Sequence, residues 1–532
     1  MSNERAIRRE VGTIALMFTG LGSIIGSGWL FGAWRAAQLA GPGAVYAWII
    51  GAVVILFVAI NYAELGAMLP ESGGAVRFGH YSHGTLVGLV AGFAAWIAVV
   101  SVIPVEAEAS VQYMSSWPWS WAQHLYVHAP NGRGELTFPG LAICAVLVVI
   151  YFLVNFWSVK VFAGTNSAIT FFKLIVPAAT AIALMCSGFH PGNFKIGIHG
   201  GRHVTDLASI LTAVATSGIV FSYNGFQSPV NLASEARHPS SVPIAIFGSL
   251  VLSTAVYLLL QVAFLGAVAP EHLSEGWGAL EYSSPFAQLA LALNLNWLAL
   301  LLYADAFVSP SGTGTTYTAT TARMIYAMER SGTLPAFLGR VHPIFGIPRP
   351  AMWLNLLVSF TFLFFFRGWG TLAEVISIAT IITYLIVPVS VGVLRRTAPG
   401  LSRPLRIPGI EVLSPAAFMF ATLMLYWARW PHTGQIMLLL IVPLPLYLYG
   451  QAKSGWRDFA RQVAGAWWMM AYFVLLAALS FVGSREFGGR GYLSYGWDQA
   501  CVAVMALVFY YWGRRSGWHT PALAALEASR AR

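Results

Sequence analysis

The sequence predicts an all-α integral membrane protein, and its composition and the spacing of its apolar segments both indicate this class. The 532 residues are 57% hydrophobic but only 9% Asp, Glu, Lys and Arg, whereas an ordinary soluble domain has about 25% charged residues. So few charges could not keep a soluble globule of this size in solution, and the same composition excludes disorder. The Phe, Trp and Tyr content of 14% suits rings that anchor at lipid interfaces.

Apolar windows of about 20 residues, the length that crosses the hydrocarbon of a bilayer, occur fourteen times along the chain. The predicted spans are 12–40, 43–68, 86–114, 139–157, 162–187, 205–233, 243–269, 297–328, 351–366, 372–394, 413–430, 435–450, 464–483 and 497–513. The first apolar run extends past signal-peptide length without a small-residue cleavage site, so we expect a retained membrane helix. The loops between spans are too short for an independent soluble domain.

The distribution of Lys and Arg predicts the orientation of the chain. When residues 1–11 are placed in the cytoplasm, most of the 30 Lys and Arg residues fall in cytoplasmic segments, as the positive-inside rule expects. The segment 270–284 is then extracellular and contains glutamates but no basic residue. We therefore expect a multi-pass protein of the cell (cytoplasmic) membrane, with cytoplasmic tails at 1–11 and 514–532. The net charge of +10 is explained by this topology and does not indicate nucleic acid binding.

Two spans contain residues that a continuous helix would avoid. The segment 19–28 has four glycines, and each costs about 1 kcal/mol in a helix interior relative to Ala. The segment 221–229 contains an Asn-Gly pair and ends in a proline. Freed backbone at membrane depth is tolerated where it lines a cavity, and matching interruptions in two halves of a chain point to a transporter site. Half-helix N-termini would face a carboxylate there, and freed carbonyl groups would face an ammonium group.

We therefore expect a small substrate to be bound by residues of the two interruptions. The candidates are Ser23, Ile24, Gly26, Ser27 and Gly28 in the first, and Phe221, Tyr223, Asn224, Gly225 and Gln227 in the second. For the first interruption alone, glycines that permit close helix packing are the alternative explanation. Nucleotide binding is disfavoured, because the glycines follow no strand and are followed by no Lys-Ser or Lys-Thr pair.

Several motifs resemble those of the amino acid–polyamine–organocation (APC) permeases. Residues 22–28 look like the signature of their first helix, and Tyr62-Ala63-Glu64-Leu65 resembles the end of their second. Residues 231–239 are similar to the loop that closes the sixth helix, and residues 322–335 to the end of the eighth. Within the superfamily, the segments 103–108 and 309–317 look most like the aspartate:proton symporter branch.

This resemblance covers spans one to ten and implies a leucine-transporter-like bundle of two inverted five-helix repeats. The repeats would be 12–187 and 205–394, working by alternating access, with spans eleven to fourteen (413–513) as an extension outside this core. The resemblance also nominates aspartate or another acidic amino acid as the substrate. Lys173 matches, by position, the fifth-helix lysine that in proton-coupled relatives stands where sodium-coupled relatives bind an ion.

Ionisable residues at membrane depth are functional candidates, because an unpaired charge there costs several kcal/mol. Lys173 lies near the middle of the fifth span and could carry a proton, or it could snorkel to an interface. Glu106 and Glu108 project about 200° apart around a helix, so one is expected to face the pathway, and either could instead be a structural partner. The eighth span is expected to pass Lys173 with the hydroxyls of Ser309, Ser311 and Thr313, which could also bond their own backbone. For Asp305 in the same span we expect a structural role.

Three charged residues near the predicted cytoplasmic ends of spans are gating candidates: Glu64, Glu235 and Arg323. Inner ion pairs would suit them, although solvated helix-end charges are the simpler expectation. Gln227 is neutral where many relatives carry an acid, which disfavours cationic substrates. The histidines, including His80 and His83, are expected to be solvated loop residues. Neither a metal nor a cofactor is therefore predicted.

The sequence thus predicts a secondary active transporter that takes up an amino acid with a proton, and the resemblance nominates an acidic one. Exchange, facilitated diffusion and a neutral amino acid substrate remain alternatives, because aromatic residues of the interruptions would also fit a neutral side chain. A membrane-embedded enzyme is disfavoured because no catalytic cluster emerges, and a sensor because the tails are short. A channel is disfavoured because no filter motif occurs. The expected partners are a small amino acid, a proton and the lipid bilayer.

Overall fold

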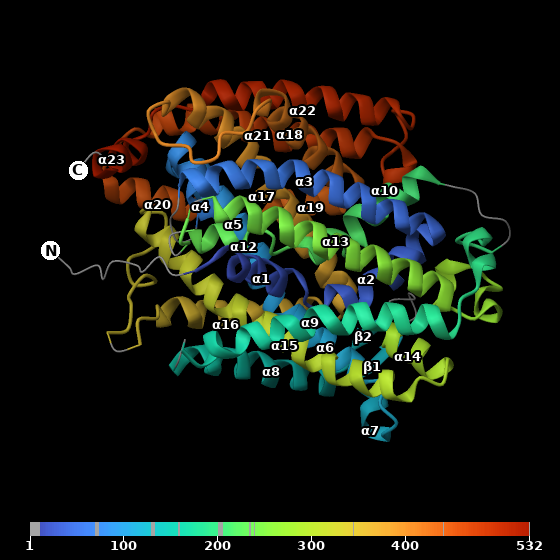
Figure 1. Ribbon diagram of the computed structural model, residues 1–532. Coiled ribbons are helices and arrows are strands. Elements are labelled where there is room, and N and C mark those ends of the chain that lie inside the picture. Colours follow the sequence, from blue (N-terminus) through green and yellow to red (C-terminus); the bar gives the residue numbers. More distant parts are fainter. Residues whose placement is uncertain are drawn as a thin grey trace.

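The computed structural model describes residues 11–69, 74–128, 134–157, 160–200, 206–233, 236–238, 240–343, 345–439 and 441–530. Within these ranges the chain is a helical bundle whose two strands, β1 (Tyr126–His128) and β2 (Gly134–Leu136), pair as one short antiparallel hairpin (Figure 1). Eight helical stretches among the described residues are long and apolar enough to cross a membrane. The predicted helical membrane fold is confirmed, with this hairpin as a small addition.

The first half of the chain supplies the helices α1 (Thr13–Ile24), α2 (Gly28–Ala40), α3 (Ala44–Met68), α4 (Gly74–His83), α5 (Thr85–Val100), α6 (Val102–Met114), α7 (Ser120–Gln123), α8 (Phe138–Trp157) and α9 (Lys160–Ser187), with 3₁₀ turns at Gly41–Gly43 and Pro191–Lys195. The predicted span 86–114 is interrupted at Ser101 between α5 and α6. Pro104 explains the interruption, because it has no N–H to donate to the carbonyl group one turn earlier.

The second half supplies α10 (Leu207–Thr216), α11 (Ile219–Tyr223), α12 (Ser228–Asn231), α13 (Ser241–Ala267), α14 (Pro285–Ala292), α15 (Asn296–Arg330), α16 (Arg349–Phe365), α17 (Trp369–Thr397), α18 (Ile410–Trp427), α19 (His432–Leu439), α20 (Leu444–Ser454), α21 (Phe459–Val482), α22 (Trp497–Ser516) and α23 (Pro521–Arg530), with 3₁₀ turns at Pro270–Leu273, Trp277–Ala279 and Arg485–Phe487. The predicted span 435–450 is divided between α19 and α20, where two prolines, Pro443 and Pro445, each remove a backbone donor.

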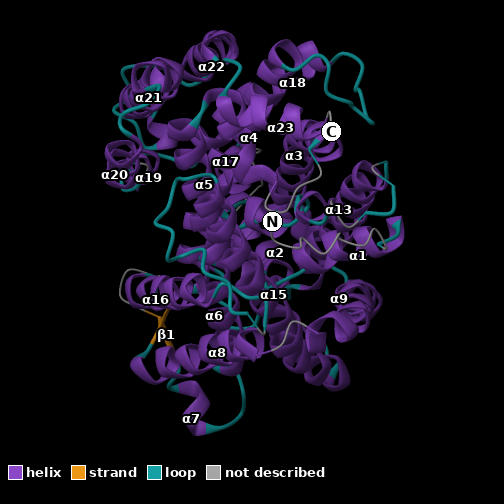
Figure 2. Cartoon of the chain, turned by 90° about the vertical axis from the view of Figure 1, so that its left-hand side faces the viewer, coloured by secondary structure: helices purple, strands orange, loops and turns teal. Residues whose placement is uncertain are grey.

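The C-terminal helices form a separate flank of the bundle. Figures 1 and 2 both show α18, α21 and α22 on one side, while α8 and α9 lie on the opposite side. The flank packs on the rest of the molecule mainly through α17 and α3, which contact α18. The interrupted helices lie between the two sides, so the region that carries the candidate site is enclosed by other helices.

The end of the chain is folded against the bundle, although the sequence predicts a tail at 514–532. The helix α23 contacts α4, and the guanidinium of Arg530 donates to the carbonyl oxygen of Met68 at 3.0 Å. His83 is fully buried, with its Nε2 atom 2.9 Å from the carbonyl oxygen of Gly513. Burial lowers the pKa of His83 to about 4, so the side chain is neutral. The expectation of a solvated histidine is wrong here, because the C-terminal segment covers it.

Candidate functional site

Both predicted interruptions are present, and they touch each other. Residues 25–27 separate α1 from α2, and residues 224–227 separate α11 from α12. Gly225 has a φ of +119°, and a Cβ atom at this position would lie 2.6 Å from the carbonyl carbon of Ser23. Only glycine permits both this backbone conformation and this approach. The main chains of the two breaks are therefore in direct contact inside the bundle.

A cavity of about 180 Å³ lies between the two breaks, and we call it the central cavity. Five predicted substrate residues line it, namely Ser23, Ile24, Gly26, Phe221 and Asn224, together with Val102 and Glu106 of α6 and Thr313 and Tyr317 of α15. Pockets that enclose drug-sized ligands have volumes of about 300–1,000 Å³. The central cavity therefore suits a small molecule held by main chain and polar side chains.

Two further predicted residues of the first break contact other helices instead of the cavity. The N–H of Ser27 donates to Oε2 of Glu106 at 2.8 Å, and its hydroxyl accepts from Nε1 of Trp369 at 2.9 Å. A Cβ atom on Gly28 would lie 2.9 Å from Cα of Ser222. Gly28 therefore serves close packing between the two interrupted helices, and Ser27 links the first break to α6 and α17.

The second break is closed largely by its own side chains. Oε1 of Gln227 accepts from the N–H of Gly225 at 3.1 Å, and Nε2 of Gln227 donates to Oδ1 of Asn224 at 2.8 Å. The Nδ2 atom of Asn224 is buried without a hydrogen-bond partner among the described residues. Tyr223 packs against the ring of Tyr257 at a centroid distance of 5.5 Å and does not line the central cavity. Asn224 is thus the side chain of this break that offers an open donor to a ligand.

Lys173, on α9, forms hydrogen bonds at the first break. Its Nζ atom donates to the carbonyl oxygen of Gly22 at 3.0 Å and to Oγ1 of Thr313 at 2.6 Å. The residue is 2% exposed, so the alternative of snorkelling to an interface is wrong. The ammonium group therefore satisfies a carbonyl group that the end of α1 leaves free.

Of the two glutamates on α6, Glu106 faces the central cavity. Its Oε2 atom accepts from Ser27, and its Oε1 atom has no hydrogen-bond partner among the described residues. This Oε1 atom and Oγ1 of Thr313, which accepts from Lys173, both lie against Gly26. Glu108 is equally buried but does not line the central cavity, and neither of its oxygens has a hydrogen-bond partner in the described part of the chain. The expectation that the pair points in different directions is confirmed.

The hydroxyls of α15 divide among three different partners. Ser309 donates to Oδ1 of Asp305 at 2.7 Å, and Ser311 lies 3.1 Å from the hydroxyl of Tyr151. Thr313 alone of the three predicted residues is hydrogen-bonded to Lys173. The expectation of a hydroxyl on α15 beside the lysine is confirmed, but Ser309 and Ser311 do not supply it, because the contact falls one helical turn beyond Ser309.

Sequence reasoning missed two tyrosines that bind the freed main chain. The hydroxyl of Tyr257 lies 3.1 Å from the carbonyl oxygen of Ile24 and 2.9 Å from that of Ser222, so it reaches both interrupted helices. The hydroxyl of Tyr317 donates to the carbonyl oxygen of Ser23 at 3.4 Å. Tyrosine in an apolar span also suits a membrane interface, so residue type gave no signal specific to this role.

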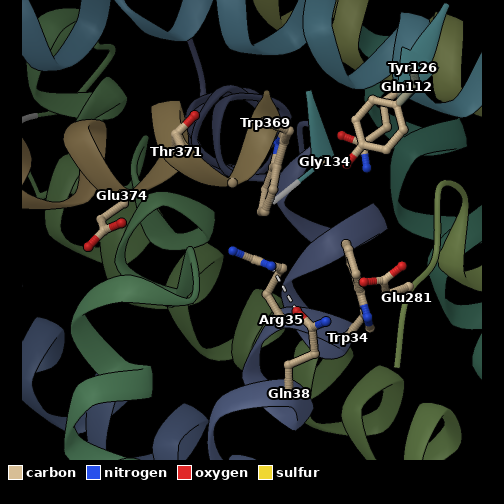
Figure 3. A pocket seen from close by; sticks show the side chains of 11 residues that line it. Trp34, Arg35, Gln38, Gln112, Tyr126, Gly134, Glu281, Trp369, Thr371 and Glu374 are labelled. Atoms are coloured by element: carbon tan, nitrogen blue, oxygen red, sulfur yellow. Dashed lines mark hydrogen bonds between the residues drawn. The ribbon is translucent and has the colours of Figure 1, made fainter. Parts of the chain in front are cut away.

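Two larger cavities flank the central one, and we name them for the sides that the expected orientation gives them. The inner cavity, of about 510 Å³, shares Asn224 and Tyr317 with the central cavity and is also lined by Gln227. The outer cavity, of about 600 Å³, is lined by Trp369 (Figure 3). The Trp369 ring stacks on Phe31 at 4.8 Å and meets Phe221, which lines the central cavity, edge-on at 5.8 Å. Aromatic rings therefore separate the outer cavity from the central one.

The gating candidates have different environments. Glu64 is 1% exposed, and both of its oxygens accept from Arg395 of α17 at 2.7 Å. The expectation of a solvated helix-end charge is wrong for Glu64, because this bidentate pair is enclosed where α3 meets α17. Arg323 is exposed at the rim of a different cavity, lined by α8, α15 and α16, and makes no ion pair with Glu64. Glu235 lies outside the described residues.

Known proteins resemble this chain over nearly its whole length. Residues 11–444 match the family model described as amino acid permease. The chain is 55% identical over 517 residues to the glutamate/serine transporter AimA of Bacillus subtilis, which covers 97% of this chain and 95% of that protein. It is 35% identical over 523 residues to the aspartate-proton symporter of the same organism, covering 97% and 98% of the two chains. The branched-chain amino acid permease BcaP is 25% identical over 463 residues, covering 85% of this chain and 95% of that protein.

Proposed function

The chain belongs to the amino acid permease family and is an amino acid transporter rather than an enzyme, and from this premise we propose that it takes up an acidic amino acid together with protons. The observation that carries the proposal is the contact of the two breaks around the central cavity, with Lys173 and Glu106 at the first break. One relative is named as a glutamate/serine transporter and another as an aspartate-proton symporter. These three amino acids have the same head group and differ in the side chain.

The breaks supply complementary groups for that head group. The N-terminus of α2 carries a partial positive charge and N–H groups that suit a carboxylate. This helix begins two residues after Gly26, which lines the central cavity together with Asn224 and its open Nδ2 donor. The free Oε1 atom of Glu106 suits an ammonium group, whereas the carbonyl groups of Gly22, Ser23 and Ile24 already accept from Lys173, Tyr317 and Tyr257. A zwitterion can therefore be bound without any charged residue in the second break.

Proton binding would be linked to substrate binding through Glu106. As long as Glu106 is ionised, its Oε2 atom holds the N–H of Ser27, a donor that a substrate carboxylate also needs. Protonation weakens a carboxyl group as an acceptor, so it would release this N–H to the substrate and favour binding of both together. Lys173 donates to Thr313, which lines the central cavity together with Glu106, and it would compensate for the change in charge.

Alternating access would then open the central cavity to the outer and inner cavities in turn. We propose that the repeats 12–187 and 205–394 perform this movement, and that both termini lie on the cytoplasmic side of a bacterial cell membrane. The helices within 413–513 would stabilise the bundle through their contact with α17. Glu64 and Arg395 would act at the inner end, since their ion pair joins α3 to α17.

Uptake into proteoliposomes tests the proposal. Glutamate and aspartate uptake should saturate, should follow an imposed gradient that is alkaline inside, and should stop with a protonophore. The Lys173→Ala variant should lose gradient-driven uptake by about tenfold or more, which is at least about 1.4 kcal/mol. The Lys453→Ala variant, which removes an exposed lysine from α20, is the matched control and should transport normally.

Two results would contradict this proposal. Uptake that is independent of the proton gradient but requires an amino acid inside the vesicles would show that the protein is an exchanger. Saturable uptake of serine or branched-chain amino acids, without any uptake of glutamate or aspartate, would show that the substrate assignment is wrong.

A further inference from the structure

A cavity of about 340 Å³ lies between α8, α15 and α16, and we call it the lateral cavity. These three helices contact one another on the side of the bundle opposite the C-terminal flank (Figures 1 and 2). The lining consists of Asn155, Ala319, Ala322, Arg323, Met352 and residues 346–348. None of these residues lines the central cavity, so a ligand here would lie away from the proposed substrate path.

The lateral cavity is positively charged. Arg323 lines it, and its guanidinium makes no hydrogen bond or ion pair with the residues that the structure describes. Residues 319–352 contain four arginines and a single acidic residue, Glu329, whose carboxylate packs against Gly339. In the expected orientation this segment is at the cytoplasmic end of the bundle. The excess of basic groups attracts anions to this end of α15.

Arg349 adds a second guanidinium at the edge of the lateral cavity. It follows Pro348, which lines the cavity, and its Cζ atom lies over the rings of Phe156 at 4.1 Å and Phe345 at 4.8 Å. Its Nη2 atom is 3.5 Å from the carbonyl oxygen of Phe156, and its Nε atom has no hydrogen-bond partner among the described residues. The two rings fix the plane of the guanidinium, so the donors along its edge can bind an oxyanion.

The start of α16 supplies main-chain donors to the same cavity. Residues 346–348 line the cavity immediately before this helix, and Met352 lines it from the end of the first turn. The helical ladder begins with the N–H of Met352, which donates to Pro348, so the N–H of Ala351 precedes it. A helix N-terminus attracts phosphate groups. Here it acts together with Arg323, a charged side chain from a different helix.

Exposed apolar side chains border the lateral cavity on the outside of the bundle. Trp353 follows Met352 directly, is 56% exposed, and lies with its ring 4.8 Å from that of Phe152 on α8. Leu357 continues this exposed face of α16 one turn further and is 64% exposed. Tryptophan favours the interface between lipid headgroups and hydrocarbon. The positive groups of the cavity are therefore expected at headgroup depth, with a surface for acyl chains beside them.

We infer that the lateral cavity binds the headgroup of an anionic phospholipid from the cytoplasmic leaflet. Arg323, Arg349 and the N–H of Ala351 bind the phosphate oxygens, and an acyl chain lies along the exposed face of α16. Basic pockets between membrane helices bind anionic lipids in this way. A zwitterionic headgroup fits less well, because its cationic group finds two arginines and no carboxylate. The bound lipid joins α15 to α16 and stabilises the bundle from outside the transport path.

Thermal unfolding of the delipidated full-length protein in a non-ionic detergent tests this inference, because a ligand that binds only the folded state raises the Tm with its concentration. Phosphatidylglycerol should raise the Tm saturably, whereas phosphatidylcholine with the same acyl chains should not. Inorganic phosphate at equal ionic strength should also have no effect, because it lacks the acyl chains. This last comparison distinguishes a lipid headgroup from a free anion.

The effect should depend on the arginines of the lateral cavity. Arg323→Gln should raise the phosphatidylglycerol concentration that gives half of the rise in Tm about tenfold, as expected for the loss of a hydrogen bond to a charged group. Since Arg323 has no partner within the described protein, the Tm without lipid should not change. Arg457→Gln, which removes an exposed arginine from the loop between α20 and α21, is the matched control and should bind the lipid as the wild type does.

Native mass spectrometry gives a second measurement that does not depend on the Tm. The wild type should retain one more phosphatidylglycerol molecule per chain than the Arg323→Gln, Arg349→Gln double variant. An equal number in both proteins, or equal lipid affinity in the wild type and Arg323→Gln, would overturn the site. A rise in Tm with phosphatidylcholine or inorganic phosphate as large as that with phosphatidylglycerol would overturn the assignment to an anionic lipid. None of these measurements involves uptake, so the site and the transport proposal can fail separately.

Discussion

The two helix breaks meet at one point, but different chemistry holds each of them. The first is bonded by side chains from other helices, including the ionisable pair of Lys173 on α9 and Glu106 on α6. The second is closed by the neutral amides of Asn224 and Gln227, which belong to the break itself. Both solutions satisfy freed backbone groups, as a buried chain requires.

If transport is coupled to protons as we propose, this difference predicts that the coupling acts through one break only. A change in protonation would alter the bonds of the first break, because the ionisable groups of Lys173 and Glu106 make them. The same change leaves the amide bonds of the second break intact. The second break would then act as a fixed half of the binding site, and the first as the half that responds to pH.

Transport should be most sensitive to substitutions at the contact between the two breaks, and Gly225→Ala tests this expectation. The new methyl group would lie 2.6 Å from the carbonyl carbon of Ser23 and would have to push the two main chains apart. We expect uptake to fall by about 100-fold, as misplacement of binding groups by 1 Å can do. Gly332→Ala is the control, since Gly332 also has a positive φ, of +71°, but open space around it. Equal losses in both variants would mean that backbone strain, and not the contact, is responsible.

Glu106→Gln should separate proton coupling from substrate binding. Glutamine keeps an acceptor for the N–H of Ser27 but cannot ionise, so uptake should lose its dependence on external pH. Gradient-driven uptake should fall about tenfold, or about 1.4 kcal/mol, because a proton can no longer switch the bond to Ser27, while exchange of glutamate across the vesicle membrane continues. Glu108→Gln is the matched control and should keep the pH dependence of the wild type. A pH-dependent Glu106→Gln variant would show that the proton binds elsewhere.

The sequence could predict the breaks but not how they are held. Interruptions are local, because the glycines of 19–28 and the Asn-Gly pair before Pro229 disfavour a helix whatever surrounds them. A lysine in the middle of an apolar span is equally visible. The partners are not local: Glu64 meets Arg395, and Tyr257 reaches Ile24, across more than 200 residues. Such contacts depend on the rotation and depth of whole helices, so the sequence could name Ser309, Ser311 and Thr313 together but could not single out Thr313 as the partner of Lys173.

Gln227→Ala should weaken the second break without changing the response to pH. The variant loses the acceptor for Gly225 N–H and the donor to Asn224. At about 1 kcal/mol for each hydrogen bond, the KM for glutamate should rise roughly 10- to 30-fold. Uptake measured between pH 5.5 and 8 should fall in proportion at every pH. A shifted pH profile would show that the two breaks are coupled more tightly than their bonds suggest.

Tyr257→Phe should have the smallest effect and should act on both breaks together. The hydroxyl reaches the carbonyl oxygens of Ile24 and Ser222, but it has a single hydrogen to share between them. Removing it should cost about 0.5–1.5 kcal/mol, which raises the KM a few-fold and lowers the Tm of the purified protein, with the pH profile unchanged. Tyr472→Phe, which removes a hydroxyl bonded to Thr422 on the C-terminal flank, should lower the Tm without raising the KM. If Tyr257→Phe instead alters the pH profile, the tyrosine transmits the state of the first break to the second, and the second break is not the fixed half of the site.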